Sequence, residues 1–342
     1  MNRGKNHKLI VGVDIGGSKI ALGLGDFAGT LRERREFPTP AEPNPATERI
    51  AAQIMDMLAA AGTGPGALAG IGLGCAGPLD QEAGTVLNAP NLPRWANFPL
   101  RGAVAGWFDC PVWLENDANA AALGEHRFGS GQGFADMVYV TLSTGIGGGI
   151  IINNQLLRGQ GGGAGEIGHM TILPDGPLCN CGNRGCLEAL ASGPAIARRA
   201  RERLAAGGSS RLYEMAGGDP AAITSKTVAA AAAAGDRLAG EILAETIEYI
   251  GIGLGNVVTM LNPEAVIIGG GVAKIGRYLL AGAREIIGRR VRLVPPPAVL
   301  PSGLDGDVGI YGALSLALYH LKARPPEKEQ RRERRYRWEG ED

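Results

Sequence analysis

The chain has 342 residues, of which 45% are hydrophobic, and its 34 basic residues balance its 34 acidic ones. This length predicts about two domains with a sizeable core, and the zero net charge gives no support to binding of nucleic acid or of an anionic membrane. With five cysteines, no signal peptide and no apolar run near roughly 18 residues, the sequence predicts a cytoplasmic protein with no membrane partner.

The first half of the chain alternates short apolar runs with turns, and two of its segments have helical spacing. A buried strand is expected at Leu9–Asp14, a continuous apolar run that ends in an acid. Helices are expected at Ala46–Ala61 and at Asp117–Phe128, where Asn116 or Asp117 can cap the first turn. The other expected elements are a loop at Pro38–Pro45 and strands at Lys19–Gly25, Leu31–Phe37, Ala69–Gly74 and Pro111–Glu115.

The second half continues the alternation of strands and helices, which indicates an α/β protein. Its longest helical segment is Thr227–Leu261, with an alanine-rich beginning. A short strand at Ala265–Ile268 leads through three glycines into a helix that ends near Arg289. The remaining expected elements are strands at Met137–Leu142, Gly148–Ile152 and Val291–Val299, and a last helix at about Gly309–Lys322.

The segment 324–342 differs from the rest, with seven basic and six acidic residues, two prolines and almost no aliphatic side chains. Such a segment cannot bury enough apolar area to offset the entropy of ordering, so we expect it to be disordered. The basic run Arg331–Arg335 could suggest contact with nucleic acid, but interleaved glutamates favour a solvated tail.

Glycine is unusually frequent, at 55 of 342 residues, and it is clustered next to predicted strands. The first cluster, Gly16 and Gly17, follows Asp14 at a strand end. Two glycines let backbone N–H groups approach phosphate oxygens, while Ser18 and Lys19 add a hydroxyl and a charge. Asp14 would need a cation such as Mg²⁺ between itself and a phosphate. This turn is a candidate phosphate site, although hairpin glycines are also common.

Two more glycine loops lie next to predicted strands. Thr144–Gly149 joins two strands, and Gly269–Gly271 lies between a strand and a helix, where a nucleotide can rest against the helix N-terminus. Neither loop matches the standard phosphate-loop or dinucleotide patterns, and either could be an ordinary tight turn. Three such loops together favour nucleotide binding. The residues expected to contact the nucleotide here are Thr144, Gly145, Gly147, Gly270 and Gly271.

The pair Asn116–Asp117 stands where a strand ends and an alanine-rich helix opens. Small side chains let that helix pack closely while the polar pair points into a cleft. An aspartate at a helix start is often only a cap, so this segment alone leaves both interpretations open. Asp117 is the candidate catalytic residue.

His169 is followed by three cysteines, Cys179, Cys181 and Cys186, in a loop rich in glycine and asparagine. One histidine and three cysteines complete the tetrahedral shell of zinc, and a closed shell is typical of a structural site. A disulfide or inert buried thiols are the alternatives. Two glutamates flank the loop and are placed to bind a ligand beside the metal, namely Glu166 and Glu188.

Together these motifs resemble the ROK family of sugar kinases and transcriptional repressors. The zinc motif, in which Gly165–His169 precedes the three cysteines and Glu188, is the specific part of a resemblance that covers roughly residues 8–322. Three further segments are similar to the family's first phosphate motif, its catalytic segment and its second glycine loop, namely Asp14–Lys19, Asn116–Asn119 and Thr144–Gly149.

The resemblance implies an actin-like (ribonuclease H-like) ATPase fold with two domains around a central cleft. The small domain would hold residues 1–117 and 305–323, and the large domain residues 118–304 with the zinc loop, followed by the charged tail 324–342. Family members are commonly dimers or tetramers, so a homo-oligomer is expected. One departure is Gly74–Pro78, where relatives often carry Pro-Gly-Pro; it affects the lining near Cys75.

The resemblance also implies transfer of the γ-phosphoryl group of ATP, with Mg²⁺, to the 6-hydroxyl of a hexose. Glucose is the expected substrate, while fructose, mannose, N-acetylglucosamine and N-acetylmannosamine stay open. Polyphosphate is the alternative donor, but no long basic groove is visible, which favours ATP. Asp117 would accept the hydroxyl proton. The sugar would be held by Asn116, Asp117, Glu166, His169 and Glu188, with a structural zinc ion fixing the tautomer of His169.

Two other functions are alternatives to a kinase, namely a sugar-responsive repressor and a non-catalytic actin-like protein. Repressors of the family carry an added N-terminal DNA-binding domain, and the 13 residues before Asp14 leave no room for one. A non-catalytic actin-like protein would use the glycine loops, but it would leave the Asn116–Asp117 pair and the zinc-linked glutamates without a role. Both functions fit the motifs less well than a sugar kinase.

Overall fold

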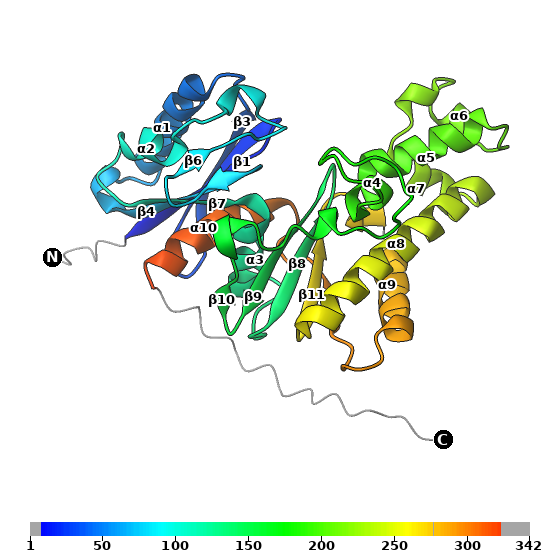
Figure 1. Cartoon of the computed structure of the whole chain (residues 1–342). Helices are drawn as coiled ribbons and strands as arrows, with labels where there is room; N and C mark the ends of the chain where they lie inside the picture. Colours follow the sequence, from blue (N-terminus) through cyan, green and yellow to red (C-terminus); the bar gives the residue numbers. More distant parts are fainter. Residues whose placement is uncertain (1–7, 276, 323–342) are drawn as a thin grey trace.

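Two five-stranded sheets and the helices around them form the protein in the computed structural model, which describes residues 8–275 and 277–322 (Figure 1). The first sheet takes its strands from residues 9–116 and the second from residues 137–301. The predicted α/β class is confirmed; the predicted domain boundaries stay a prediction, and segment 324–342 lies outside the described residues. Within the described ranges, no helix combines the length and the apolar character that crossing a bilayer requires.

The first sheet has the order β3-β2-β1-β4-β7. Its central strand β1 (Leu9–Ile15) pairs in parallel with β4 (Leu68–Cys75) and antiparallel with β2 (Lys19–Gly25). Strand β3 (Leu31–Pro38) is an edge strand of alternating exposed charges, which discourages pairing with another chain. The other elements of this half are β7 (Val112–Asn116), the hairpin β5 (Leu79–Asp80) and β6 (Thr85–Val86), and helices α1 (Pro43–Ala60) and α2 (Leu100–Ala105).

The second sheet has the order β10-β9-β8-β11-β12. Its outer face is covered by helices, which lie together on the opposite side of the molecule from α1 (Figure 1). The strands are β8 (Met137–Leu142), β9 (Ile146–Ile152), β10 (Gln155–Leu156), β11 (Ala265–Gly269) and β12 (Ala298–Pro301). The helices are α4 (Leu187–Ala191), α5 (Gly193–Ala205), α6 (Leu212–Met215), α7 (Ser225–Ala233), α8 (Arg237–Leu261) and α9 (Arg277–Arg290).

Helices α3 (Asp117–Phe128) and α10 (Val308–His320) lie between the two sheets (Figure 1). Helix α10 packs on β1 and β4, and α3 packs on β8 and β9. The two helices cross at glycines, because a Cβ on Gly124 would lie 2.8 Å from the backbone nitrogen of Gly312. The pair therefore joins both halves of the molecule, and α3 begins with the candidate catalytic residue.

The alternation of side chains along β1 decides where Asp14 points. Successive side chains of a strand face opposite sides of the sheet, and Val11 and Val13 belong to the core shared with α1 and α2. Ile10 instead packs with Ile310 of α10. Asp14 lies four residues after Ile10 and therefore on the same face of the strand. Its carboxylate thus also faces α10, at the inner side of the sheet.

Three sequence-based boundaries were wrong. The predicted helix Thr227–Leu261 is two helices, because Gly235 has φ +82° and Asp236 caps α8 by accepting the Ala239 N–H at 2.9 Å. The predicted strand Val291–Val299 is limited to β12, since the prolines at 295–297 have no N–H for a sheet. Helix α1 begins inside the predicted loop, at Pro43, because proline suits the first helical turn.

Candidate active site

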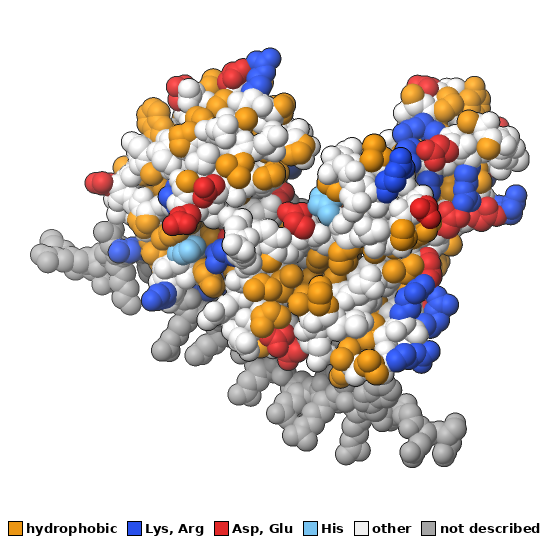
Figure 2. All heavy atoms as spheres, in the orientation of Figure 1, with side chains coloured by type: hydrophobic (Ala, Val, Ile, Leu, Met, Phe, Trp, Pro, Cys, Tyr) orange, Lys and Arg blue, Asp and Glu red, His pale blue; other side chains and the backbone are white. Residues whose placement is uncertain are grey.

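A cleft of about 210 Å³ lies at the junction of β7 and α3 and takes its lining from both halves of the molecule. Figure 2 shows the hollow between the two halves, with acidic side chains and a histidine at its margin. Residues that follow β4 form one wall, and a glycine segment after β10 forms the other. Its described lining includes Gly77, Pro78, Leu79, Gln81, Leu87, Asn116, Asp117, Asn119, Gly147, Gly161, Gly162, Gly163, Gly165 and Glu166.

Asn116 is the N-cap of α3, and Asp117 is its first helical residue. The Oδ1 atom of Asn116 accepts the N–H of Ala118 at 2.9 Å and that of Asn119 at 3.2 Å. This leaves the NH₂ group of Asn116 as the donor that can face a ligand. The sequence allowed either Asn116 or Asp117 to cap the helix. In the structure Asn116 is the cap, and Asp117 lines the cleft.

Two carboxyl groups influence each other at this edge of the first sheet. Burial raises the pKa of Asp117, the Ala118 N–H lowers it and the charge of Glu166 raises it. The pKa of Asp14 is raised to about 6, mainly by burial, then by the charge of Asp117, with Lys19 opposing. Two acids that disfavour each other's charge are a suitable environment for a cation.

The first glycine turn lies between β1 and β2, and Gly16 closes it by donating its N–H to the Lys19 carbonyl at 3.0 Å. Gly17 has no room for a side chain, because a Cβ would lie 2.8 Å from Asn91. Gly17 and Ser18 are exposed. Lys19 reaches Glu36 at 3.2 Å and lines a larger cavity beside the cleft. The turn thus presents its backbone and one ammonium group to this side of the molecule.

The larger cavity has a volume of about 810 Å³ and lies between the ends of β8 and β11 and the start of α10. Gly270 has φ +92° and a Cβ there would overlap the Leu142 carbonyl, so only glycine fits. Gly271 also lines the adjoining 340 Å³ cavity, together with Ser143 and Thr144. These loops therefore meet around connected space. Further residues that line this cavity were not predicted from the sequence, namely Thr141, Ser225, Lys226, Lys274, Ser302 and Asp305.

The cleft and the larger cavity adjoin across one pair of strand residues. Gly147 lines the cleft, and its partner on β8, Thr141, lines the larger cavity. Gly147 belongs to β9, which begins at Ile146 and not at Gly148 as predicted, so the loop before it is shorter than predicted. Gly145 remains in the loop, where a Cβ would lie 2.7 Å from Glu188.

His169, Cys179, Cys181 and Cys186 come together, with their ligand atoms all within 4.8 Å of one another. The Sγ atoms of Cys181 and Cys186 are 3.7 Å apart, and Nδ1 of His169 is 3.7 Å from Sγ of Cys179. The three Sγ atoms and the histidine nitrogen can thus face one point. The three thiols are free, which excludes the alternative of a disulfide among them.

The metal cluster lies beside the cleft, because His169 of the cluster is next to Glu166 of the cleft lining. The Nε2 atom of His169 is 3.8 Å from Oε2 of Glu166, which lines the cleft, while Nδ1 faces the cysteines. Glu188 follows Cys186 at the start of α4 and accepts the Ile146 N–H at 2.9 Å. Of these three residues, Glu166 lines the cleft, His169 lies beside Glu166, and Glu188 holds the loop between β8 and β9.

Comparison with known proteins agrees with this geometry. The sequence pattern of the ROK family matches residues 10–320. A glucokinase of Streptomyces coelicolor is 38% identical over 316 residues, which cover 90% of this chain and 97% of that relative. Among solved structures, a ROK hexokinase from Thermus thermophilus has a TM-score of 0.80 at 36% identity, covering 92% of this chain and 99% of the other.

A second solved structure is a ROK family glucokinase from Streptomyces griseus in complex with glucose and AMPPNP. It has a TM-score of 0.77 at 39% identity and covers 91% of this chain and 99% of the other. These neighbours confirm the predicted actin-like fold. The match over nearly the whole chain, together with these identities, shows that this protein belongs to the ROK family.

Proposed function

We propose that the protein transfers the γ-phosphoryl group of ATP to the 6-hydroxyl of glucose. The observation that carries this proposal is the position of Asp117, in a cleft lined by polar groups and adjoining a much larger cavity with lysines. The related Streptomyces griseus enzyme binds glucose and AMPPNP, which supports a sugar in the cleft and a nucleotide in the larger cavity.

Asp117 is the proposed general base. As the sugar oxygen bonds to the γ-phosphorus, the bond from that phosphorus to ADP breaks and ADP leaves. The Asp117 carboxylate accepts the proton of the sugar hydroxyl, and bases of this kind contribute about 10²–10⁴ in rate. The carboxylate is held by its place in the first turn of α3 and by the Ala118 N–H at 2.8 Å. Most remaining catalysis comes from positioning and from neutralising charge, because phosphoryl transfer needs little covalent work from the protein.

Asp14 is the proposed residue for Mg²⁺. Burial, and then the charge of Asp117, raises the pKa of its carboxyl group to about 6. Oxygen atoms are the ligands that Mg²⁺ prefers. Asp14 would hold the cation, which would supply positive charge against that of the phosphates. Backbone amides of Gly16 and Gly17 and the Ser18 hydroxyl would hold the phosphates, with Lys19, Thr144, Gly145, Gly270 and Gly271 on the other sides.

The sugar hydroxyls would be bound by Asn116, Glu166, His169 and Glu188 beside Asp117. Each hydroxyl is both donor and acceptor, and the site offers one amide, one imidazole and three carboxylates for them. A site that buries such groups rejects analogues without the matching hydroxyl, often by large factors. This supports selectivity among hexoses, and turnover with N-acetyl sugars is measured in the assay below.

Zinc fits the cysteine cluster geometrically. Zn–S bonds of about 2.3 Å in a tetrahedron place two sulfur atoms about 3.8 Å apart, close to the 3.7 Å between Cys181 and Cys186. His169, Cys179, Cys181 and Cys186 would complete the shell, so zinc would stabilise the loop and take no part in the reaction. Ligation through Nδ1 would leave the Nε2–H of His169 to donate to the sugar.

The test is a coupled assay of ADP release with MgATP across hexoses and N-acetylhexosamines, with polyphosphate as a second donor. Turnover confined to glucose supports the proposal. Turnover only with an N-acetyl sugar overturns the substrate and keeps the reaction. No turnover by a folded, zinc-replete sample overturns the proposed kinase activity and favours a sugar-binding regulator or an actin-like scaffold. The expected cytoplasmic location and homo-oligomeric state remain predictions.

A further inference from the structure

Glu115 is a buried carboxylate that directly precedes the Asn116–Asp117 pair. It is the fourth residue of β7, and only 1% of its surface is exposed. A charged group buried to this degree requires a partner, because its desolvation is otherwise too costly. The proposed reaction gives Glu115 no role, so its partners indicate what it does.

The two oxygen atoms of Glu115 bind different parts of the molecule. Oε1 accepts the backbone N–H of Asn116 at 3.0 Å and the side-chain amide of Asn119 at 3.1 Å. Both of these residues belong to the cleft-lining segment at the start of α3. Oε2 accepts Nε of Arg158 at 2.7 Å, from the chain that follows β10 in the second half of the molecule. One carboxylate thus links the proposed catalytic segment to the opposite half.

Arg158 directly precedes the glycine segment 159–165, which forms one wall of the cleft. Four of its glycines, at 159, 161, 162 and 165, have positive φ, and glycine backbones lose more conformational entropy on ordering than other residues. The segment therefore depends on anchors at its ends. Arg158 is such an anchor, through Glu115 and through its guanidinium carbon 5.7 Å from the Tyr319 ring of α10.

Gln81 makes a second link across the cleft. Its Nε2 donates to Oε1 of Glu115 at 3.4 Å, and its amide is packed against Gly162, where a Cβ would overlap it. Gln81 comes from the segment between β5 and β6 of the first half. Glu115 is thus bound by Gln81 of one wall, by Arg158 at the start of the other wall, and by the segment that carries Asp117.

We infer that Glu115 and Arg158 form a positioning pair that aligns the glycine wall of the cleft with Asn116 and Asp117. The inference rests on the proposed function, and it adds that sugar binding depends on an ion pair that does not touch the sugar. Removing Arg158 leaves a buried charge without its partner and frees the glycine segment. Removing the charge of Glu115 releases Arg158 and weakens the hold on Asn116.

The first test compares Arg158→Met, Arg158→Lys and Glu115→Gln with the wild type. A misplaced reacting group costs up to about 100-fold, so Arg158→Met is expected to lower kcat/KM for the sugar by about 10- to 100-fold. The KM for ATP stays within about twofold, because the larger cavity lacks these residues. Arg158→Lys restores part of the loss. In the double variant with Glu115→Gln, the loss is smaller than the product of the single losses.

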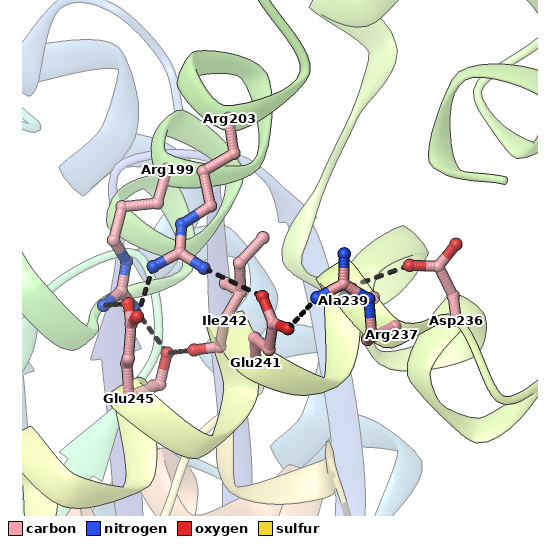
Figure 3. Close-up of polar contacts among 9 residues, drawn as sticks. Arg199, Arg203, Asp236, Arg237, Ala239, Glu241, Ile242 and Glu245 are labelled. Atoms are coloured by element: carbon pink, nitrogen blue, oxygen red, sulfur yellow. Dashed lines mark hydrogen bonds and ion pairs between the residues drawn. The ribbon is translucent and has the colours of Figure 1, made fainter. Parts of the chain in front are cut away.

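Arg203→Met is the matched control. Arg203 pairs with Glu241 and Glu245 between α5 and α8 (Figure 3), and none of these three residues lines the cleft. Its side chain is 34% exposed, against 30% for Arg158, so the two arginines are matched in exposure. Their partners differ, because Glu241 and Glu245 are 43% and 38% exposed and Glu115 only 1%. The control is expected to lower thermal stability with kcat/KM for the sugar within about twofold of the wild type.

Amide hydrogen exchange supplies a readout that does not depend on turnover. Arg158→Met is expected to speed exchange both at residues 159–165 and at Asn116–Asn119, 40 residues away in sequence, and Arg203→Met at neither. If exchange changes only around Arg158, the positioning role of the pair is overturned. It is also overturned if kcat/KM for the sugar falls no further in Arg158→Met than in the control. A wild type that phosphorylates no sugar overturns the proposed function, while coupled exchange of the two segments still supports the link between them.

Discussion

Asp14 and Gly309 lie in contact at the inner side of the first sheet, where the end of β1 meets the first turn of α10. A Cβ added to Gly309 would overlap the carboxylate of Asp14. The residues are far apart in the chain, and the contact places the acid beside the N-terminal end of a helix, whose partial positive charge favours an anion. The absence of a side chain at residue 309 is therefore what gives Asp14 its place.

The substitution Gly309→Ala is expected to displace Asp14 and to lower kcat by about 10- to 100-fold, because the proposed magnesium ligand moves. Steady-state kinetics over a range of Mg²⁺ concentrations measure the effect, which excess Mg²⁺ reduces in part. Gly240→Ala in α8 is the control, since no atom lies within 4 Å of its added Cβ. If the two variants had equal kcat values and equal dependence on Mg²⁺, Gly309 would have no role in positioning the proposed magnesium ligand.

Asp117→Asn keeps the shape of the proposed base and removes its ability to accept a proton. We expect kcat to fall by about 10²–10⁴, while glucose and MgATP still bind, as measured by calorimetry. Asn119→Ala is a useful comparison, because it also changes the first turn of α3 but leaves the carboxylate in place. Wild-type turnover of Asp117→Asn would refute the assignment of the base.

Activity is expected to decline as the pH falls below neutrality. Asp117 and Asp14 must both be ionised to act, and burial raises the pKa of each, to about 6 for Asp14. Cations stabilise the charged form of Asp14, so higher Mg²⁺ should move the acid limb to lower pH. The profile of kcat/KM against pH at two Mg²⁺ concentrations measures this shift. An acid limb that does not move with the Mg²⁺ concentration would show that Asp14 does not contribute to that limb.

Asp14→Asn is expected to stabilise the protein without Mg²⁺ while abolishing activity. A carboxyl group whose folded pKa is raised binds protons more tightly when folded, so its contribution to stability decreases as the pH rises from about 4 through about 6. At neutral pH the substitution recovers up to about 3 kcal/mol. Urea unfolding of both forms at pH 4.5 and pH 7.5 tests this, and equal differences at the two pH values would contradict it.

Cys181→Ala removes one ligand of the proposed zinc site, so we expect the protein to retain no metal and to have a raised KM for glucose, because His169 then loses the contact that fixes its ring. Elemental analysis of the purified protein measures the metal, and kinetics measure KM on the same sample. Cys110→Ala is the control, since Cys110 is half-buried near the end of α2 and outside the cluster. A metal-free variant with unchanged KM would separate the metal from the sugar site.

Sequence alone determined the features that depend on neighbouring residues. The helix Asp117–Phe128 and the strand Lys19–Gly25 were predicted with the bounds that the structure has, because capping, periodicity and glycine punctuation act within a few residues. The cysteine cluster was equally visible, since three of its ligands lie within eight residues. The break at Gly235 was also local, but it was hidden in a sequence of alanines that favours a continuous helix.

Tertiary structure decided which distant groups meet. Nothing in the spacing of the sequence pairs Asp14 with Gly309, Gly124 with Gly312, or Glu115 with Arg158. The helix and strand patterns show only which face of an element is buried. The partner on that face follows from how the sheets pack on α3 and α10, and the pKa of Asp14 follows in turn from the burial that this packing imposes. Burial and charge at the cleft are therefore properties of the assembled fold, because they depend on atoms from both halves of the chain.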